Sequence, residues 1–102
     1  METKFTNGPW RCSLSEPLRV LDSDSWIIAT THACDGMISE ASSNATLIAS
    51  APEMYAQFEK SIQDFYAIAR KLDYAGMNDD ARKCEDYAEN IKAVLKKARG
   101  EF

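Results

Sequence analysis

Apolar residues follow two different periods along this 102-residue chain. In the first third they alternate with polar residues. Trp10, Cys12 and Leu14 occupy every second position, which is typical of a strand with one covered face. Residues 26–31 then form a short run rich in β-branched and aromatic side chains, the composition that strands favour. The pattern predicts an antiparallel β-meander of about three strands over residues 9–31.

Turn-forming residues separate the predicted strands from one another and from the helical part of the chain. Pro17 interrupts the alternation before a second strand begins at Leu18, and the Asp and Ser residues at positions 22–25 form a turn cluster. Residues 32–43 are predicted to be a connecting loop, with its turn at Asp35-Gly36.

From residue 44 onward the apolar spacing becomes helical. Ser50, Pro52 and Glu53 have the order of an N-cap, a first-turn proline and a capping-box acid, so a long helix is predicted over residues 51–75. Because a proline inside a helix costs about 3 kcal/mol, residues 44–49 are predicted to form a separate short helix. A kinked helix that is continuous through Pro52 is the alternative.

The long helix and a further helix over residues 78–99 each carry a heptad seam. Gly76 is the expected C′ residue of the first helix, and Asn78 is the predicted N-cap of the second. An aromatic seam facing an alanine-rich one lets the axes approach closely, which predicts an antiparallel αα-hairpin. The first seam comprises Tyr55, Phe58, Ile62, Phe65, Ala69 and Leu72, and the second comprises Met77, Ala81, Cys84, Ala88, Ile91, Leu95 and Ala98.

These elements predict one domain, residues 1–102, of the α+β class: a short N-terminal antiparallel β-meander, a short helix and a long antiparallel αα-hairpin. The formal charge of −4, without a basic patch, argues against nucleic acid as a ligand. No apolar run reaches the ~20 residues that cross a bilayer, and the first residues lack the layout of a secretory signal. A cytoplasmic protein without membrane contact is therefore expected.

One short segment combines a base, a nucleophile and a carboxylate, namely His32, Cys34 and Asp35. In an extended segment His32 and Cys34 would point the same way and generate a thiolate. Because no oxyanion-hole donor accompanies them, no catalytic residue is assigned and no enzymatic activity is expected. Asp22 and Asp24 lack the glycine and distal glutamate of a calcium loop. Neither a metal site nor a cofactor is predicted.

Two sets of residues are candidates for binding. Hydroxyls and free backbone N–H groups at a helix start can hold an anion, which predicts a site for a phosphorylated small molecule of the nucleotide type at the sheet–helix junction, with plain capping as the alternative. This set is Thr30, Thr31, His32, Ser42, Ser43 and Asn44. Apolar and tyrosine side chains that flank the seams predict a protein interface and a homo-oligomer, with packing on the sheet as the alternative. This set is Met54, Tyr66, Tyr74, Tyr87 and Val94.

The segment Asn44–Met54 reads N-A-T-L-I-A-S-A-P-E-M. It resembles the N-A-x-L-I-A-x-A-P-E-[LM] helix start of a family of small uncharacterised bacteriophage and prophage accessory proteins. Val20–Ala29 resembles the hairpin of that family, with Ser25 where glycine is usual. The resemblance implies a phage-encoded, non-enzymatic protein of the host bacterial cytoplasm that binds and inhibits a host protein, such as a defence component. An oligomeric sponge that sequesters a signalling nucleotide is the alternative.

Overall fold

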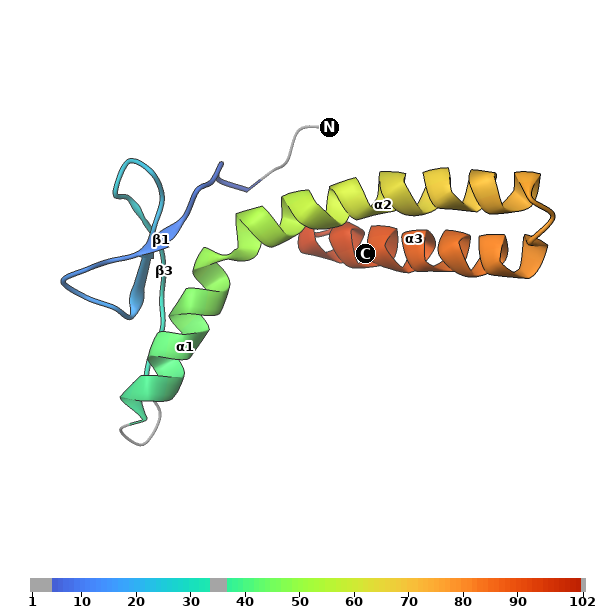
Figure 1. Cartoon of the computed structure of the whole chain (residues 1–102). Helices are drawn as coiled ribbons and strands as arrows, with labels where there is room; N and C mark the ends of the chain where they lie inside the picture. The colour runs from blue at the N-terminus through green and yellow to red at the C-terminus, as the bar shows by residue number, and fades with distance from the viewer. Residues whose placement is uncertain (1–4, 34–36, 102) are drawn as a thin grey trace. The chain divides into compact units, whose positions relative to one another are not determined.

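The computed structural model describes residues 5–33 and 37–101, and the chain divides into two compact units, Met1–Met54 and Tyr55–Phe102. Three strands precede three helices in the order β1–β2–β3–α1–α2–α3 (Figure 1). The predicted α+β class, with an N-terminal meander and a long helical hairpin, is therefore confirmed. None of the described helices is both long and apolar enough to span a membrane.

The meander consists of β1 (Arg11–Cys12), β2 (Arg19–Leu21) and β3 (Ile27–Thr30). The strands are antiparallel and lie in the order β1-β2-β3. Val20 lies in the central strand between Cys12 and Ala29 and is completely buried. Alternation predicted the first strand and β-favouring composition the third. The predicted row of Trp10, Cys12 and Leu14 is only partly observed, because β1 contains Cys12 alone of the three and Leu14 is fully exposed.

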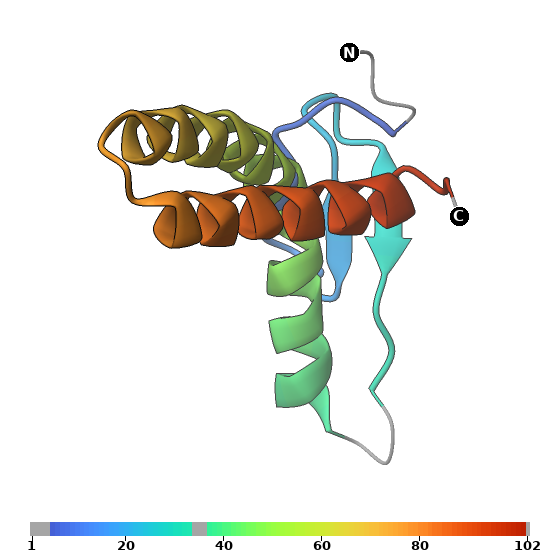
Figure 2. The same ribbon diagram turned by 90° about the vertical axis from the view of Figure 1, so that its right-hand side faces the viewer.

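Helix α1 (Ile38–Ala49) packs against this sheet (Figure 2). Its buried residues, Ala41 and Ala45, are four positions apart and thus share one helical face. The predicted loop over residues 32–43 is wrong from Ile38 onward, because the helix begins six residues before the predicted start at residue 44. Met37 occupies the N-cap without a side-chain hydrogen bond, so no capping signal marks this start. Packing of the alanine face on the sheet stabilises the helix instead. The predicted turn at Asp35-Gly36 lies outside the described residues.

Helix α2 (Ala51–Tyr74) is separate from α1, as predicted, because Pro52 has no N–H to donate to the carbonyl one turn back. Ser50 directly precedes the first residue of α2, which is the position predicted for the N-cap, but its hydroxyl bonds to α1 instead. Ser50 is the C-cap of α1, and its hydroxyl donates to the Thr46 carbonyl at 3.1 Å. The Ser50 carbonyl accepts from the Met54 N–H at 3.0 Å, which makes the first backbone bond of α2.

Helices α2 and α3 (Asn78–Ala98) form the antiparallel hairpin of the second unit (Figure 1). Their buried residues recur at every seventh position, as a heptad seam requires. Rings from the two helices meet at Phe65 and Tyr87, whose centroids are 5.6 Å apart, and Arg99 donates to the Tyr55 hydroxyl at 3.0 Å. The buried residues are Tyr55, Ile62 and Ala69 in α2 and Ala81, Ala88 and Leu95 in α3.

A Schellman turn joins the two helices. The Gly76 N–H donates to the Asp73 carbonyl at 3.0 Å, and the Met77 N–H donates to the Leu72 carbonyl at 2.8 Å. Gly76 has φ +79°, a left-handed conformation that glycine adopts without a side-chain clash, so its predicted role is confirmed. Asn78 is not the predicted N-cap. It is the first residue of α3, and Met77 occupies the cap position without a side-chain hydrogen bond.

Candidate functional site

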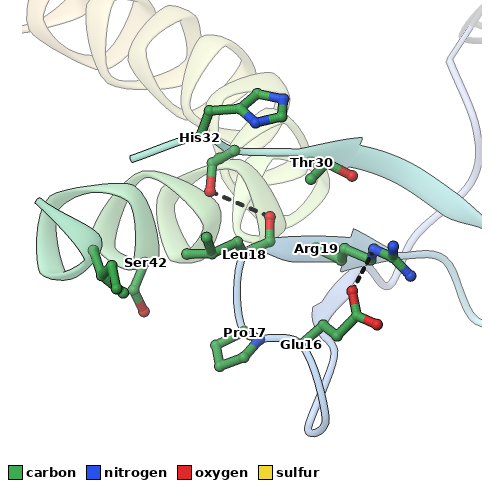
Figure 3. A pocket seen from close by; sticks show the side chains of 9 residues that line it. Glu16, Pro17, Leu18, Arg19, Thr30, His32 and Ser42 are labelled. Carbon is green, nitrogen blue, oxygen red and sulfur yellow. Dashed lines mark hydrogen bonds and ion pairs between the residues drawn. The ribbon is translucent and has the colours of Figure 1, made fainter. Parts of the chain in front are cut away.

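The first unit contains a pocket of about 460 Å³ where the start of β2, the end of β3 and the first half of α1 meet (Figure 3). Four of the six residues predicted to hold an anion, Thr30, Thr31, His32 and Ser42, contribute to its lining. The complete lining is Glu16, Pro17, Leu18, Arg19, Thr30, Thr31, His32, Ile38 and Ser42. The structure therefore brings Ser42 of α1 together with the consecutive residues Thr30, Thr31 and His32, from which it is distant in the sequence.

Thr31 joins the sheet to the helix at this pocket. Its N–H donates to the Leu18 carbonyl at 2.8 Å. Its hydroxyl lies within donating distance of two carbonyl oxygens, those of Ala41 at 2.8 Å and Leu18 at 3.2 Å. Because its single hydroxyl proton is shared between these backbone carbonyls, Thr31 holds the pocket wall in place. Toward a ligand the Thr31 hydroxyl can then only accept a hydrogen bond.

The charges of the pocket are already paired with each other. Arg19 Nε lies 2.7 Å from Glu16 Oε2, and both side chains remain partly exposed. His32 is exposed, and Figure 3 shows its ring directed away from Ser42. The remaining walls include Pro17 and other apolar side chains. The pocket thus suits a small molecule with an apolar body and an anionic group that competes with Glu16 for the guanidinium.

Ser43 and Asn44 do not line this pocket, so the structure does not bring them together there with the other four residues of the predicted anion site. The reason is the earlier start of α1. Only the first four N–H groups of a helix lack an intrahelical acceptor, and both residues lie beyond them. The Ser43 hydroxyl donates to the Ser39 carbonyl of its own helix at 3.0 Å, and Asn44 is exposed.

Two other possibilities considered from the sequence are a reactive Cys–His pair and a metal site. Cys34 and Asp35, the proposed partners of His32, lie outside the described residues. Among the residues that the structure does describe, no group of three or more His, Cys, Asp or Glu side chains could hold a metal ion.

The five residues predicted at a protein interface fall into two groups. Four of them are exposed: Met54, Tyr74, Tyr87 and Val94. Tyr66 is half-buried and engaged within the hairpin. Its hydroxyl donates to the Glu89 carboxylate, and the Lys92 ammonium lies 5.5 Å from the centre of its ring. The hydrogen bond to Glu89 raises the pKa of the Tyr66 phenol above its usual value. Tyr66 thus belongs to a polar flank of the hairpin.

The turn between β2 and β3 is held by the side chain of Asp22, a role that the sequence did not predict. Asp22 is 9 % exposed, and its Oδ1 accepts the N–H groups of Asp24 and Trp26, each at 2.9 Å. The Asp22 N–H donates to the Trp26 carbonyl at 2.9 Å, and the Ser25 N–H donates to the Asp22 carbonyl at 3.1 Å. Four hydrogen bonds therefore fix the backbone that leads into Trp26.

Ser25 completes this turn in a strained conformation. Its φ of +67° is left-handed, a region that glycine adopts without a side-chain clash and that other residues rarely adopt. Arg11 from β1 donates to the Ser25 hydroxyl at 2.7 Å and so ties the turn to the neighbouring strand.

The turn displays Trp26, whose side chain is 73 % exposed. The sequence pattern assigned this tryptophan to the third strand because it begins a β-favouring run. The strand begins at Ile27 instead. The missed signal is its position directly after the Asp-Ser-Asp-Ser cluster, where a turn controls the direction of the side chain.

Comparison with known proteins identifies one family. The family model described as Salmonella phage P22 protein Y8K6 matches residues 1–102, which includes both units. No curated protein and no solved structure matches the chain.

Proposed function

The chain belongs to the family of Salmonella phage P22 protein Y8K6, and we propose that this phage-encoded accessory protein binds and inhibits a host bacterial protein. The target is a component of the host's defence, reached in the host cytoplasm. Inhibition is stoichiometric and involves no catalysis by the phage protein. The observation that carries this proposal is the exposed Trp26 on its hydrogen-bonded turn.

Tryptophan is the side chain most enriched among the residues that dominate binding energy at protein interfaces, because its large ring fills a pocket of the partner. Trp26 is largely exposed to solvent in this chain. The bonds from Asp22 hold its backbone in place before any partner arrives. Binding therefore costs little ordering entropy, which is the advantage of a preorganised anchor.

The strain at Ser25 supports the same interpretation. A residue other than glycine in the left-handed region costs of order 1 kcal/mol and persists only where its surroundings enforce it. Here the surroundings are Arg11 and Asp22. The net charge of −4 further favours a partner whose Trp-binding pocket has a basic rim, since opposite charge accelerates encounter.

The test compares Trp26→Ala with a matched control, Leu14→Ala. Leu14 is also apolar, belongs to the same unit and is 100 % exposed. In capture from a lysate of the host bacterium, wild type and Leu14→Ala are expected to retain the same host protein. Trp26→Ala is expected to lose at least about 30-fold in affinity, equivalent to the ~2 kcal/mol of a hot-spot residue.

The captured protein is then purified, and its activity is titrated with the phage protein. Complete inhibition of the host protein is expected at one molar equivalent of the wild-type phage protein. The Trp26→Ala variant should not inhibit at this ratio, although its thermal unfolding should be the same as that of wild type. Equal capture by wild type and Trp26→Ala contradicts the anchor. The absence of any specific host protein at micromolar bait contradicts the function.

The pocket favours a second candidate function, the sequestration of a phosphorylated small molecule. Arg19 would bind the phosphate in place of Glu16, and the apolar walls would cover the rest of the ligand. A nucleotide at a hundredfold excess over its Kd is expected to stabilise the protein by ~2.7 kcal/mol in a thermal-shift experiment. Arg19→Gln should abolish this shift, whereas Asn44→Ala, outside the pocket, should retain it. A panel of nucleotides without any shift rules this candidate out.

A further inference from the structure

The meander of the first unit has two unlike edges. Because the strands lie in the order β1-β2-β3, β1 and β3 each have a neighbouring strand on one side only (Figure 2). The edge at β1 is two residues long, carries the charge of Arg11 and closely follows Pro9. Shortness, charge and proline are devices by which proteins keep an edge strand from pairing. The edge at β3, here called the β3 edge, is four residues long and has neither a charge nor a proline.

The backbone of Thr30 faces outward from the β3 edge. The N–H of the next residue, Thr31, donates to the Leu18 carbonyl at 2.8 Å and therefore points toward β2. Successive residues of an antiparallel strand direct their N–H and C=O groups to opposite sides. The N–H and carbonyl of Thr30 thus point away from β2, and no strand lies on that side among the described residues. An extended backbone is the group that pairs with such a donor and acceptor.

Hydrogen bonds hold β3 at both of its ends. Directly before the strand, the Trp26 N–H donates to Asp22 Oδ1 and the Trp26 carbonyl accepts from the Asp22 N–H, both at 2.9 Å. Directly after it, Thr31 bonds to the carbonyls of Leu18 and Ala41. The edge is therefore extended before any partner arrives, and only the partner's segment has to be ordered on binding.

Exposed apolar side chains stand at the start of the β3 edge. Trp26 is 73 % and Ile27 is 54 % exposed, and Thr30 is exposed at the other end. A chain that lies along β3 passes both apolar side chains, so the edge is continuous with the Trp26 anchor. In strand addition, main-chain hydrogen bonds supply affinity and fix the register, while side chains in pockets supply specificity.

The register of β3 argues against a second copy of this chain as the occupant. Val20 pairs with Ala29 and Leu21 pairs with Ile27, so Ile28 is an extra residue in a bulge. Two β3 strands related by a two-fold axis would contain this irregularity twice within four residues. Bulges are among the devices by which edges avoid pairing with their like. A segment of a different protein meets the bulge only once.

We propose that the host protein bound by Trp26 adds an extended segment to the β3 edge, as a fourth strand of the meander. This inference rests on the proposed binding of a host protein and specifies which part of that protein is bound. The segment accepts a hydrogen bond from the Thr30 N–H and donates one to the Thr30 carbonyl. It carries an apolar side chain beside Ile27, and the surface next to it contains the pocket for the Trp26 ring.

The first test compares Thr30→Pro with Thr30→Val, using the host protein purified by capture on the wild-type chain. Proline removes only the outward N–H and is tolerated on an edge strand where that group faces solvent. Thr30→Pro is expected to raise the Kd at least about tenfold, because the partner's carbonyl loses its donor. Thr30→Val keeps the N–H and the branched shape, so it should bind at least about tenfold more tightly than Thr30→Pro. Equal Kd values for two folded variants overturn strand addition.

The second test needs no substitution, because it follows hydrogen exchange of single amides in the wild-type chain by NMR. In the free chain the Thr30 N–H is expected to exchange at least about tenfold faster than the Thr31 N–H, which is bonded to Leu18. Saturation with the purified host protein should slow exchange at Thr30 at least about tenfold. Unchanged exchange at Thr30 in the complex contradicts the proposal. Protection in the free chain that disappears on dilution also overturns it, since a second copy would then occupy the edge.

These outcomes separate strand addition from the proposed function. Capture that depends on Trp26 but not on the Thr30 N–H overturns strand addition alone and leaves inhibition of the host protein in place. A lysate in which wild type captures no host protein overturns both.

Discussion

Ala88→Asp is expected to unfold the helical hairpin, while Ala93→Asp in the same helix leaves it folded. Ala88 is 0 % exposed and lies in the middle of α3, where its small side chain leaves little space between the two helices. An ionised carboxylate there has neither space nor a partner, and burial of an unpaired charge costs several kcal/mol. That cost approaches the whole stability of a small unit, since domains are stable by ~5–15 kcal/mol.

Far-UV circular dichroism during thermal unfolding measures this effect, since α2 and α3 contribute most of the helix of the chain. Ala93 is the matched control because it is exposed. Its substitution carries the same loss of helix propensity, roughly 0.7 kcal/mol or less. Similar melting of the two variants would show that the α2–α3 seam does not hold the hairpin together.

The second large effect is expected at the turn that carries Trp26. Asp22→Ala removes the acceptor of two backbone N–H groups in a nearly buried position. Hydrogen bonds to a charged acceptor contribute about 1.5–3 kcal/mol each, and the N–H groups left behind lose their partner. A loss of about 2–3 kcal/mol in the free energy of unfolding of the first unit is expected, because water can reach part of the vacated space.

Denaturant unfolding followed by tryptophan fluorescence measures this loss, and Asp24→Ala is the control. Asp24 is exposed and contributes its N–H, not its carboxylate, to the turn. Its substitution should therefore cost less than about 0.5 kcal/mol. Asp22→Asn retains a side-chain oxygen acceptor, so its free energy of unfolding should lie between those of Asp22→Ala and Asp24→Ala. An Asp22→Ala variant as stable as Asp24→Ala would mean that the turn is not held by this carboxylate.

The same substitution connects stability to the proposed function. Without the Asp22 carboxylate, the backbone of Trp26 loses the bond that holds it before binding. The ring would then have to be ordered during association, which costs affinity even where the unit remains folded. Asp22→Ala is thus expected to weaken host-protein capture in the direction of Trp26→Ala.

The exposed apolar side chains are distributed differently in the two units. In the first unit several apolar residues are exposed, and Trp26 differs from the others in being an aromatic anchor on a hydrogen-bonded turn, which suits insertion into a partner's pocket. In the second unit the exposed apolar side chains of the two helices repeat with the period of the helices.

The features that could be predicted from the residues are those that depend on short-range periodicity and on backbone conformation. A period of two indicated the meander around Val20, and a period of seven indicated the hairpin seam from Tyr55 to Leu95. Gly76 and Pro52 ended and separated helices as expected, since a left-handed φ and a missing N–H act locally. The expected origin in a phage protein family is confirmed by the family model that matches the whole chain.

Contacts between distant segments set the start of α1 and the composition of the pocket. Helix α1 starts at Ile38 without a cap because the sheet covers Ala41 and Ala45, a contact that no local signal encodes. The earlier start places Ser43 and Asn44 inside the helix and outside the pocket lining, while Arg19 and Thr30 reach the pocket from separate strands.

The exposure of Trp26 likewise depends on the folded turn. An apolar run predicts burial, but the carboxylate of Asp22 and the left-handed Ser25 set the direction in which the chain enters β3. Hydrophobic pattern specifies which side chains gain from burial. The geometry of the turns specifies which of them are left in water, where a partner can bind them.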